Sequence, residues 1–249
     1  MYGLEKYFYN KRKDNGQAII EEKINNNYYR SGLISSYTFE NFVVGNSNKF
    51  AYAISYDIAK EREFYTPVFI YGSTGVGKTH LLYAIGNKVC IDNPNLKVLY
   101  ISMDEFSKEL TNAIKKEKID DFKNKYKKIA VLLIDDIQFL SGKERLQEEL
   151  GCIFDYLCHN QVQIVVASSC KPEDIPIFTE IIKEKFDCAI FHEILAPEYN
   201  TRVSILNNII NAKNIKMDNQ IIELIAKNSN LNIREMLGLV ITINAHKKL

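Results

Sequence analysis

The 249-residue chain is 46% hydrophobic and 25% charged, as expected of a globular protein with one large domain or a core and a small satellite. Its 32 Lys and Arg residues balance 31 Asp and Glu residues to a net charge of +1, which excludes a global basic field and restricts any nucleic-acid contact to a local patch. The five cysteines form no CxxC pair and the four histidines are scattered, which argues against a metal cluster and predicts free thiols. The chain has no apolar run long enough for a signal peptide or a membrane span. We therefore expect a cytoplasmic protein.

Residues 1–36 are rich in Asn, Tyr and charge and show little periodicity, which predicts a linker or partly ordered extension. From Tyr37 to Ala196, short apolar runs alternate with helix-compatible stretches. The expected strands are residues 68–71, 98–102, 131–135, 164–167 and 189–192. The expected helices are residues 78–89, 103–126 (as two helices), 143–157 and 173–185. Strands that are apolar on both faces and alternate with helices predict an α/β doubly wound core over residues 37–196, with a parallel sheet.

After Ala196 and Pro197 the strand pattern stops. Three amphipathic stretches follow, at residues 199–212, 219–228 and 232–247. They predict a small all-helical domain over residues 197–249, joined to the core by a hinge near Leu195 and Glu198.

A glycine-rich loop joins the first expected strand to the next helix. It reads Gly72-Ser73-Thr74-Gly75-Val76-Gly77-Lys78-Thr79 and is followed by His80. Such a loop lets successive backbone N–H groups converge on phosphate oxygens, and the helix that begins there adds the positive end of its dipole. Lys78 is expected to reach the β- and γ-phosphates, and the Thr79 hydroxyl to ligate Mg²⁺. The position between a strand and a helix disfavours a chance glycine-rich turn.

The strand at residues 131–135 ends in two carboxylates, Asp135 and Asp136. The carboxyl ends of parallel strands face the crevice where ligands bind in open α/β sheets. Asp135 is expected to hold Mg²⁺ through water, and Asp136 to orient the attacking water in phosphoryl transfer. A pair of solvated carboxylates capping a turn is the alternative, which the phosphate loop makes less favourable.

These motifs resemble the AAA+ domain of the DnaA family of bacterial chromosomal replication initiators, and the matches occur in the family's order over most of the chain. They are residues 37–48 (YTFENFVVGNSN), the phosphate loop with His80, residues 132–140 (LLIDDIQFL), residues 142–145 with 147–149, residues 201–203 with 205–206, and residues 232–235 (NIRE). The resemblance implies an AAA+ core with a parallel five-stranded sheet flanked by helices, followed by a helical lid. It implies that ATP or ADP binds with Mg²⁺, in a module that self-associates into an oligomer or filament on single-stranded origin DNA. The replicative helicase or its loader is a further partner that the resemblance implies.

The resemblance also assigns further residues. Phe42, Val44 and Gly45 are placed near the adenine, and Arg234 is placed as a sensor-2 arginine that reaches the phosphates from the lid. A long cation near the start of the last helix is compatible with such a lid, although a solvated surface arginine is the ordinary interpretation of the residue alone. Lys143 and Arg145 stand where family members contact phosphates of single-stranded DNA.

Two stretches depart from the family pattern. Alignment on Phe186 places Lys185 at the position of the trans-acting arginine finger and Ile181 at a second arginine position. A lysine keeps the charge but lacks the bidentate fork, which predicts slow ATP hydrolysis. Ser169 and Cys170 stand where the family has an acidic sensor-1 residue and an arginine.

A third departure is that the chain ends at Leu249, directly after the lid, without the family's helix-turn-helix domain for duplex DNA. A truncated initiator and a short paralogue both remain open. Residues 106–128 hold eight lysines and four acidic residues, which form either a track for single-stranded DNA or an ordinary solvated helix pair.

Two functions follow from these patterns. The first is the ATP-binding module of a DnaA-type initiator, favoured by Lys78, Thr79, Asp135, Asp136 and Arg234. The second is a regulatory or scaffold paralogue that binds nucleotide and replication partners with little hydrolysis, favoured by the departures. Whether the protein is an effective ATPase is left open.

Overall fold

The structure is a computed structural model that describes residues 32–60, 67–228 and 231–246. Most of the predicted N-terminal extension, residues 1–36, lies outside the described residues. The core is a five-stranded parallel sheet with the strand order β2-β3-β4-β1-β5. The strands are β1 (Val68–Tyr71), β2 (Val98–Ser102), β3 (Val131–Asp135), β4 (Gln163–Ser168) and β5 (Ile190–Glu193). This confirms the predicted α/β class and the parallel sheet.

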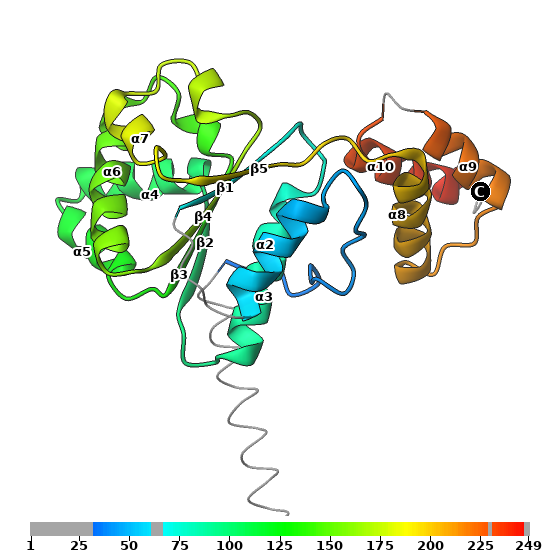
Figure 1. The fold of residues 1–249 in the computed structure, drawn as a ribbon, viewed down its shortest axis with the longest axis horizontal. Helices are drawn as coiled ribbons and strands as arrows, with labels where there is room; N and C mark the ends of the chain where they lie inside the picture. The colour runs from blue at the N-terminus through cyan, green and yellow to red at the C-terminus, as the bar shows by residue number, and fades with distance from the viewer. Residues whose placement is uncertain (1–31, 61–66, 229–230, 247–249) are drawn as a thin grey trace, which may run out of the picture.

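Helices cover both faces of the sheet (Figure 1). One face carries α2 (Lys49–Lys60) and α3 (Lys78–Asp92), and the other carries α4 (Met103–Lys115), α5 (Ile119–Tyr126), α6 (Glu144–His159) and α7 (Glu180–Glu184). Successive strand residues alternate between the two layers, because Ile70 packs with the α2 and α3 residues and Phe69 with the α4–α7 residues. Both layers are apolar, which explains why the strands read as uninterrupted apolar runs.

The C-terminal helices form a separate cluster on the far side of α2 and α3 from α4–α7 (Figure 1). They are α8 (Tyr199–Ala212), α9 (Asn219–Lys227) and α10 (Ile233–His246). Leu206, Ile222, Met236 and Val240 belong to the small apolar core of this lid. The boundary at residues 196 and 197 remains a prediction. Within the described ranges, no helix combines the length and apolar character needed to cross a membrane.

The predicted helix at residues 173–185 is wrong. The segment instead contains a 3₁₀ turn, Pro172–Asp174, an irregular stretch and the short helix α7. Pro176 has no backbone N–H to donate in a helix, and Ile177 adopts a left-handed backbone with φ of 56°. Both interrupt the helix that the charge and apolar pattern had indicated.

Helix α2 was not predicted, although its sequence carries a helical signal. Its buried residues are Ala51, Ser55, Ile58 and Ala59, spaced as one face of a helix. The tyrosines and small residues around them obscured that spacing. Helix α2 packs on α3, so it supports the helix that begins at the phosphate loop.

The segment of residues 32–47, here called the strap, lies against α3 and is fixed to it by side chains of that helix. The buried Asn87 donates from Nδ2 to the carbonyl oxygens of Ile34 (2.9 Å) and Tyr37 (2.6 Å). His80 Nε2 donates to the Thr38 carbonyl at 2.9 Å. A Cβ atom on Gly86 would approach the Leu33 side chain to 2.5 Å, so the strap and α3 are in close contact.

We expect Asn87→Ala to lower the free energy of unfolding by about 1–3 kcal/mol, because two strap carbonyls lose a buried donor. Urea denaturation measures the change. Asn124→Ala, on the exposed surface of α5, is the matched control and is expected to change stability by less than about 0.5 kcal/mol. Equal stability of the two variants would contradict an anchoring role for Asn87.

Candidate functional site

The glycine-rich loop leaves the carboxyl end of β1 and runs directly into α3. Gly75 and Gly77 have φ of 80° and 108°, in the left-handed region that glycine tolerates. Gly77 is the N-cap of α3, and no side chain of the described residues caps this helix end. The N–H groups of the first helical turn are therefore available to an anion, as they are in phosphate-binding loops.

Lys78 is the first residue of α3, and its side chain folds back over the loop. Its ammonium donates to the carbonyl oxygens of Gly72 (2.6 Å) and Ser73 (2.8 Å), and the residue is 7% exposed. Burial lowers the pKa of Lys78, and the nearby Asp135 and Asp136 carboxylates oppose that shift. The two hydrogen bonds leave one ammonium proton for a ligand. A phosphate would supply the negative charge that this buried cation needs.

Thr79 and Asp135 meet at the end of β3. The Thr79 hydroxyl donates to Asp135 Oδ2 at 2.7 Å, and the Asp136 backbone N–H donates to Asp135 Oδ1 at 3.0 Å. Burial raises the pKa of Asp135, and the Thr79 hydrogen bond acts in the opposite direction. A hydroxyl and a carboxylate beside a phosphate loop are the oxygen ligands that Mg²⁺ combines with phosphate oxygens and water. These residues fit a magnesium–nucleotide complex.

A metal ion could also be held by protein ligands alone. Within residues 32–60, 67–228 and 231–246, no group of three or more His, Cys, Asp or Glu side chains is placed to hold a metal ion.

Asp136 is oriented by a neighbour that the sequence analysis did not single out. Its backbone is left-handed, with φ of 56°, and its carboxylate accepts from Gln138 Nε2 at 2.9 Å. Gln138 Oε1 in turn accepts from the Ser169 backbone N–H at 3.1 Å. Gln138 therefore links the carboxyl ends of β3 and β4 beside the site. In the sequence, the only indication of this role is that Gln138 follows Asp136 by two residues.

Lys78, Thr79 and Asp136 line a cleft of about 360 Å³ between the core and the lid. The strap and its continuation contribute Ser36, Tyr37, Asn41, Phe42, Val43 and Asn48; the loop contributes residues 74–80; and the lid contributes Ile205, Asn208, Ile209, Ala212, Ile233, Arg234 and Leu237. The cleft therefore combines Lys78, Asp136 and Arg234 with apolar side chains. This combination suits a ligand with a polyphosphate and a flat apolar group.

The lid contacts the phosphate loop at the start of α10. Asn232 and Glu235 form reciprocal hydrogen bonds, from Glu235 N to Asn232 Oδ1 (3.0 Å) and from Asn232 N to Glu235 Oε2 (2.8 Å). A Cβ atom on Gly75 would approach Asn232 Oδ1 to 2.8 Å. Arg234 follows directly and lines the cleft, where its positive charge contributes to lowering the pKa of Lys78.

Not all the predicted base-contacting residues line this cleft. Phe42 does, whereas Val44 and Gly45 line an adjacent shallow depression with Glu198 and Thr201. At Gly45 the strap passes close to α8, because a Cβ atom there would come within 2.2 Å of Thr201 Oγ1. The Val44 side chain is 46% exposed.

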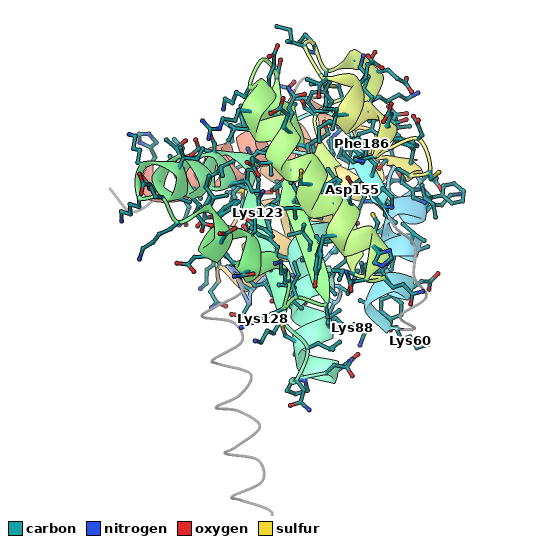
Figure 2. All side chains as sticks on the ribbon, turned by 90° about the vertical axis from the view of Figure 1, so that its left-hand side faces the viewer. Lys60, Lys88, Lys123, Lys128, Asp155 and Phe186 are labelled. Atoms are coloured by element: carbon teal, nitrogen blue, oxygen red, sulfur yellow. The ribbon has the colours of Figure 1, made fainter. Side chains whose placement is uncertain are left out.

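Lys185 lies outside the cleft, directly after α7. Its ammonium forms an ion pair with Asp155 Oδ1 of α6 at 2.6 Å, on the side of the molecule that faces the viewer in Figure 2. Ile181 packs over Gly151 of α6, where a Cβ atom would meet Ile181 Cγ2 at 3.0 Å. A role of Lys185 at a neighbouring molecule remains a prediction.

The predicted DNA-contacting residues are exposed. Lys143 is the N-cap residue of α6, and Arg145 is in its first turn. Of the eight lysines at residues 106–128, three form ion pairs: Lys108 with Asp104, Lys123 with Glu149 (2.9 Å) and Lys125 with Glu109 (2.7 Å). The exposed lysines for which the structure records no ion pair are Lys115, Lys116, Lys118, Lys127 and Lys128. Part of this segment is thus neutralised within the fold.

Comparisons with known proteins agree with this geometry. A model of the family described as the bacterial DnaA ATPase domain matches residues 33–193. Domain III of the Thermotoga maritima replication initiation protein DnaA is 37% identical, with a TM-score of 0.84 over 87% of this chain and 90% of that one. The AMPPCP-bound DnaA from Aquifex aeolicus is 36% identical, with a TM-score of 0.76 over 85% of this chain and 66% of that one.

A further solved structure is a replication initiator DnaA bound to AMPPCP and single-stranded DNA. It is 36% identical, with a TM-score of 0.77 over 85% of this chain and 65% of that one. The chain therefore spans nearly all of the isolated domain III and about two thirds of the longer DnaA chains.

Proposed function

The chain belongs to the family of the bacterial DnaA ATPase domain, and on this premise we propose that it is the ATP-binding AAA+ module of a DnaA-type replication initiator. The observation that carries this proposal is the cleft in which Lys78, Thr79 and Asp136 meet the lid residue Arg234, with Asp135 hydrogen-bonded to Thr79. ATP or ADP binds there with Mg²⁺. A relative of similar structure has been solved with AMPPCP, a nucleotide analogue, which supports this assignment.

Each residue has a distinct task in the proposed complex. Residues 72–79 and the N-terminus of α3 hold the phosphates, and Lys78 neutralises their charge. Thr79 and Asp135 would hold Mg²⁺, which would supply positive charge to the phosphates when bound. Asp136, oriented by Gln138, positions the water that attacks the γ-phosphate.

The base would lie at the apolar end of the cleft, between the strap and the lid. Phe42 and Val43 come from the strap, and Ile205, Ile209 and Leu237 from the lid. Because the ligand would contact both parts, its binding favours one arrangement of lid and core. Nucleotide-switched self-assembly into an oligomer or filament is a consequence we propose from this arrangement.

We further propose that the assembled module engages single-stranded origin DNA and the replicative helicase or its loader. The DNA-bound DnaA structure supports the first of these partners. The comparisons do not favour the alternative of a regulatory or scaffold paralogue. A cytoplasmic location remains a prediction from the sequence.

Single-stranded DNA binding is expected to be weak, to depend on ATP and to fall with salt. Changing Lys143 and Arg145 together to alanine should weaken it roughly tenfold at low salt and reduce the slope of log K against log salt by about 0.7 per lost phosphate contact. Fluorescence anisotropy with a labelled oligonucleotide measures both quantities. The matched control is the double alanine variant of Lys213 and Lys216, two exposed lysines at the end of α8 and beyond.

Loss of affinity in the Lys143 and Arg145 variant alone would support the site. Equal affinity of this variant and the wild type would show that the DNA-binding patch lies elsewhere. Equal weakening by both double variants would indicate an effect of net charge instead.

A further inference from the structure

Tyr100 contacts Asp135, one of the two proposed magnesium ligands, and the mechanism proposed above gives it no role. Tyr100 lies on β2, paired with Leu133 of β3, and Asp135 follows two residues later on the same face of the sheet. The Tyr100 hydroxyl reaches across to Asp135 and donates to Oδ2 at 3.0 Å. The contact joins neighbouring strands, so it depends on their register.

The Asp135 carboxylate receives hydrogen bonds from three parts of the chain. Oδ2 accepts from the Thr79 hydroxyl (2.7 Å) and from the Tyr100 hydroxyl (3.0 Å), and Oδ1 accepts from the Asp136 backbone N–H (3.0 Å). A carboxylate has about four lone-pair positions. Three are therefore used, and the position that remains is on Oδ1.

Tyr100 is itself held in place. Its ring lies 4.4 Å from the ring of Tyr83 on α3. The single Tyr100 hydroxyl proton is donated to Asp135. Tyr83 in turn stacks on Tyr37 of the strap at 5.4 Å. A series of ring contacts thus runs from the strap to Tyr100, whose hydroxyl bonds to the carboxylate.

We propose that Tyr100 is a positioning residue for magnesium, which fixes the Asp135 carboxylate so that Oδ1 faces the metal or its water. This inference rests on the proposed nucleotide site. Without the Tyr100 hydroxyl, Oδ2 would keep only the Thr79 donor, and the carboxylate could rotate about its Cβ–Cγ bond. Groups that orient a metal-binding side chain in this way typically contribute about 10–100-fold to metal affinity.

The test is Tyr100→Phe, which removes the hydroxyl and keeps the ring against Tyr83. ADP affinity is measured by calorimetry in EDTA and across a magnesium titration. We expect wild-type ADP affinity in EDTA and a magnesium requirement raised roughly tenfold. The matched control is Tyr126→Phe, since Tyr126 is also buried but its hydroxyl has no hydrogen-bond partner among the described residues. It should leave both quantities unchanged.

Three results would overturn the inference. They are an unchanged magnesium requirement in Tyr100→Phe, an equal loss of ADP affinity with and without magnesium, and the same shift in Tyr126→Phe. The second result would mean that Tyr100 supports only the shape of the pocket. Failure of the proposed nucleotide site is distinguishable, because wild-type protein would then bind no ADP in either condition.

Discussion

Replacing Lys78 with alanine is expected to abolish ATP and ADP binding, with a loss of affinity of at least roughly 100-fold, or about 2.7 kcal/mol. The ammonium is buried, lies at the first residue of α3 and is bonded to two loop carbonyls. Removing it takes away the charge that compensates the phosphates and frees the Gly72 and Ser73 carbonyls that it holds. The remaining helix N-terminus and backbone N–H groups supply only partial charges.

Calorimetry with ATP and with ADP measures this effect. Lys88→Ala is the matched control, because Lys88 is on the same helix but pairs with Asp92 at 2.8 Å, away from the cleft. It is expected to keep wild-type affinity. Equal ATP affinity of the wild type and Lys78→Ala would refute the assignment of the site.

The elements that the sequence predicted well are those whose signals are local. Strands β1, β2 and β3 have the predicted bounds, because each is a continuous apolar run that ends at a glycine or a polar residue. The phosphate loop is a contiguous motif whose geometry depends on its own glycines. The lid helices likewise show clear periodicity, and α8 has the predicted bounds.

The features that the sequence did not predict arise from contacts between distant segments. Tyr100 and Asp135 are 35 residues apart and meet only because β2 and β3 are paired in one register. Gln138 reaches Ser169 at the end of β4 in the same way. No local sequence pattern predicts either contact, because each depends on which strands are neighbours in the sheet.

The placement of the residues predicted to contact the base also depends on contacts between distant segments. Phe42 and Val44 are two residues apart, and the resemblance assigned both to the adenine. In the structure Phe42 lines the cleft, whereas Val44 lines the adjacent depression with residues of the lid. Which residue lines which depends on how the distant lid packs against the strap, and the local sequence does not specify that packing.

The prediction with the largest effect on turnover concerns Lys185. The resemblance places it where a neighbouring molecule's γ-phosphate would need a planar, bidentate donor to neutralise charge developing on its oxygens. A lysine is a strongly hydrated point charge that is harder to desolvate at an interface. In the structure its ammonium is paired with Asp155 at 2.6 Å, so it must also leave that partner to act on another molecule. Ile181, at the second family position, supplies no cation and packs against Gly151.

We therefore expect slow ATP hydrolysis that changes little with protein concentration, with single-stranded DNA present. Lys185→Arg should restore a concentration-dependent rise, towards the roughly 10³- to 10⁵-fold contribution of arginine fingers in related nucleotidases. Steady-state turnover against protein concentration measures both. The control is Lys183→Arg, two residues earlier and paired with Glu180 at 2.8 Å, which should behave like the wild type unless the alignment is shifted. A steep rise in the wild type would mean that it already has a working finger, because only an effective cation supplied by a neighbour makes hydrolysis depend on assembly.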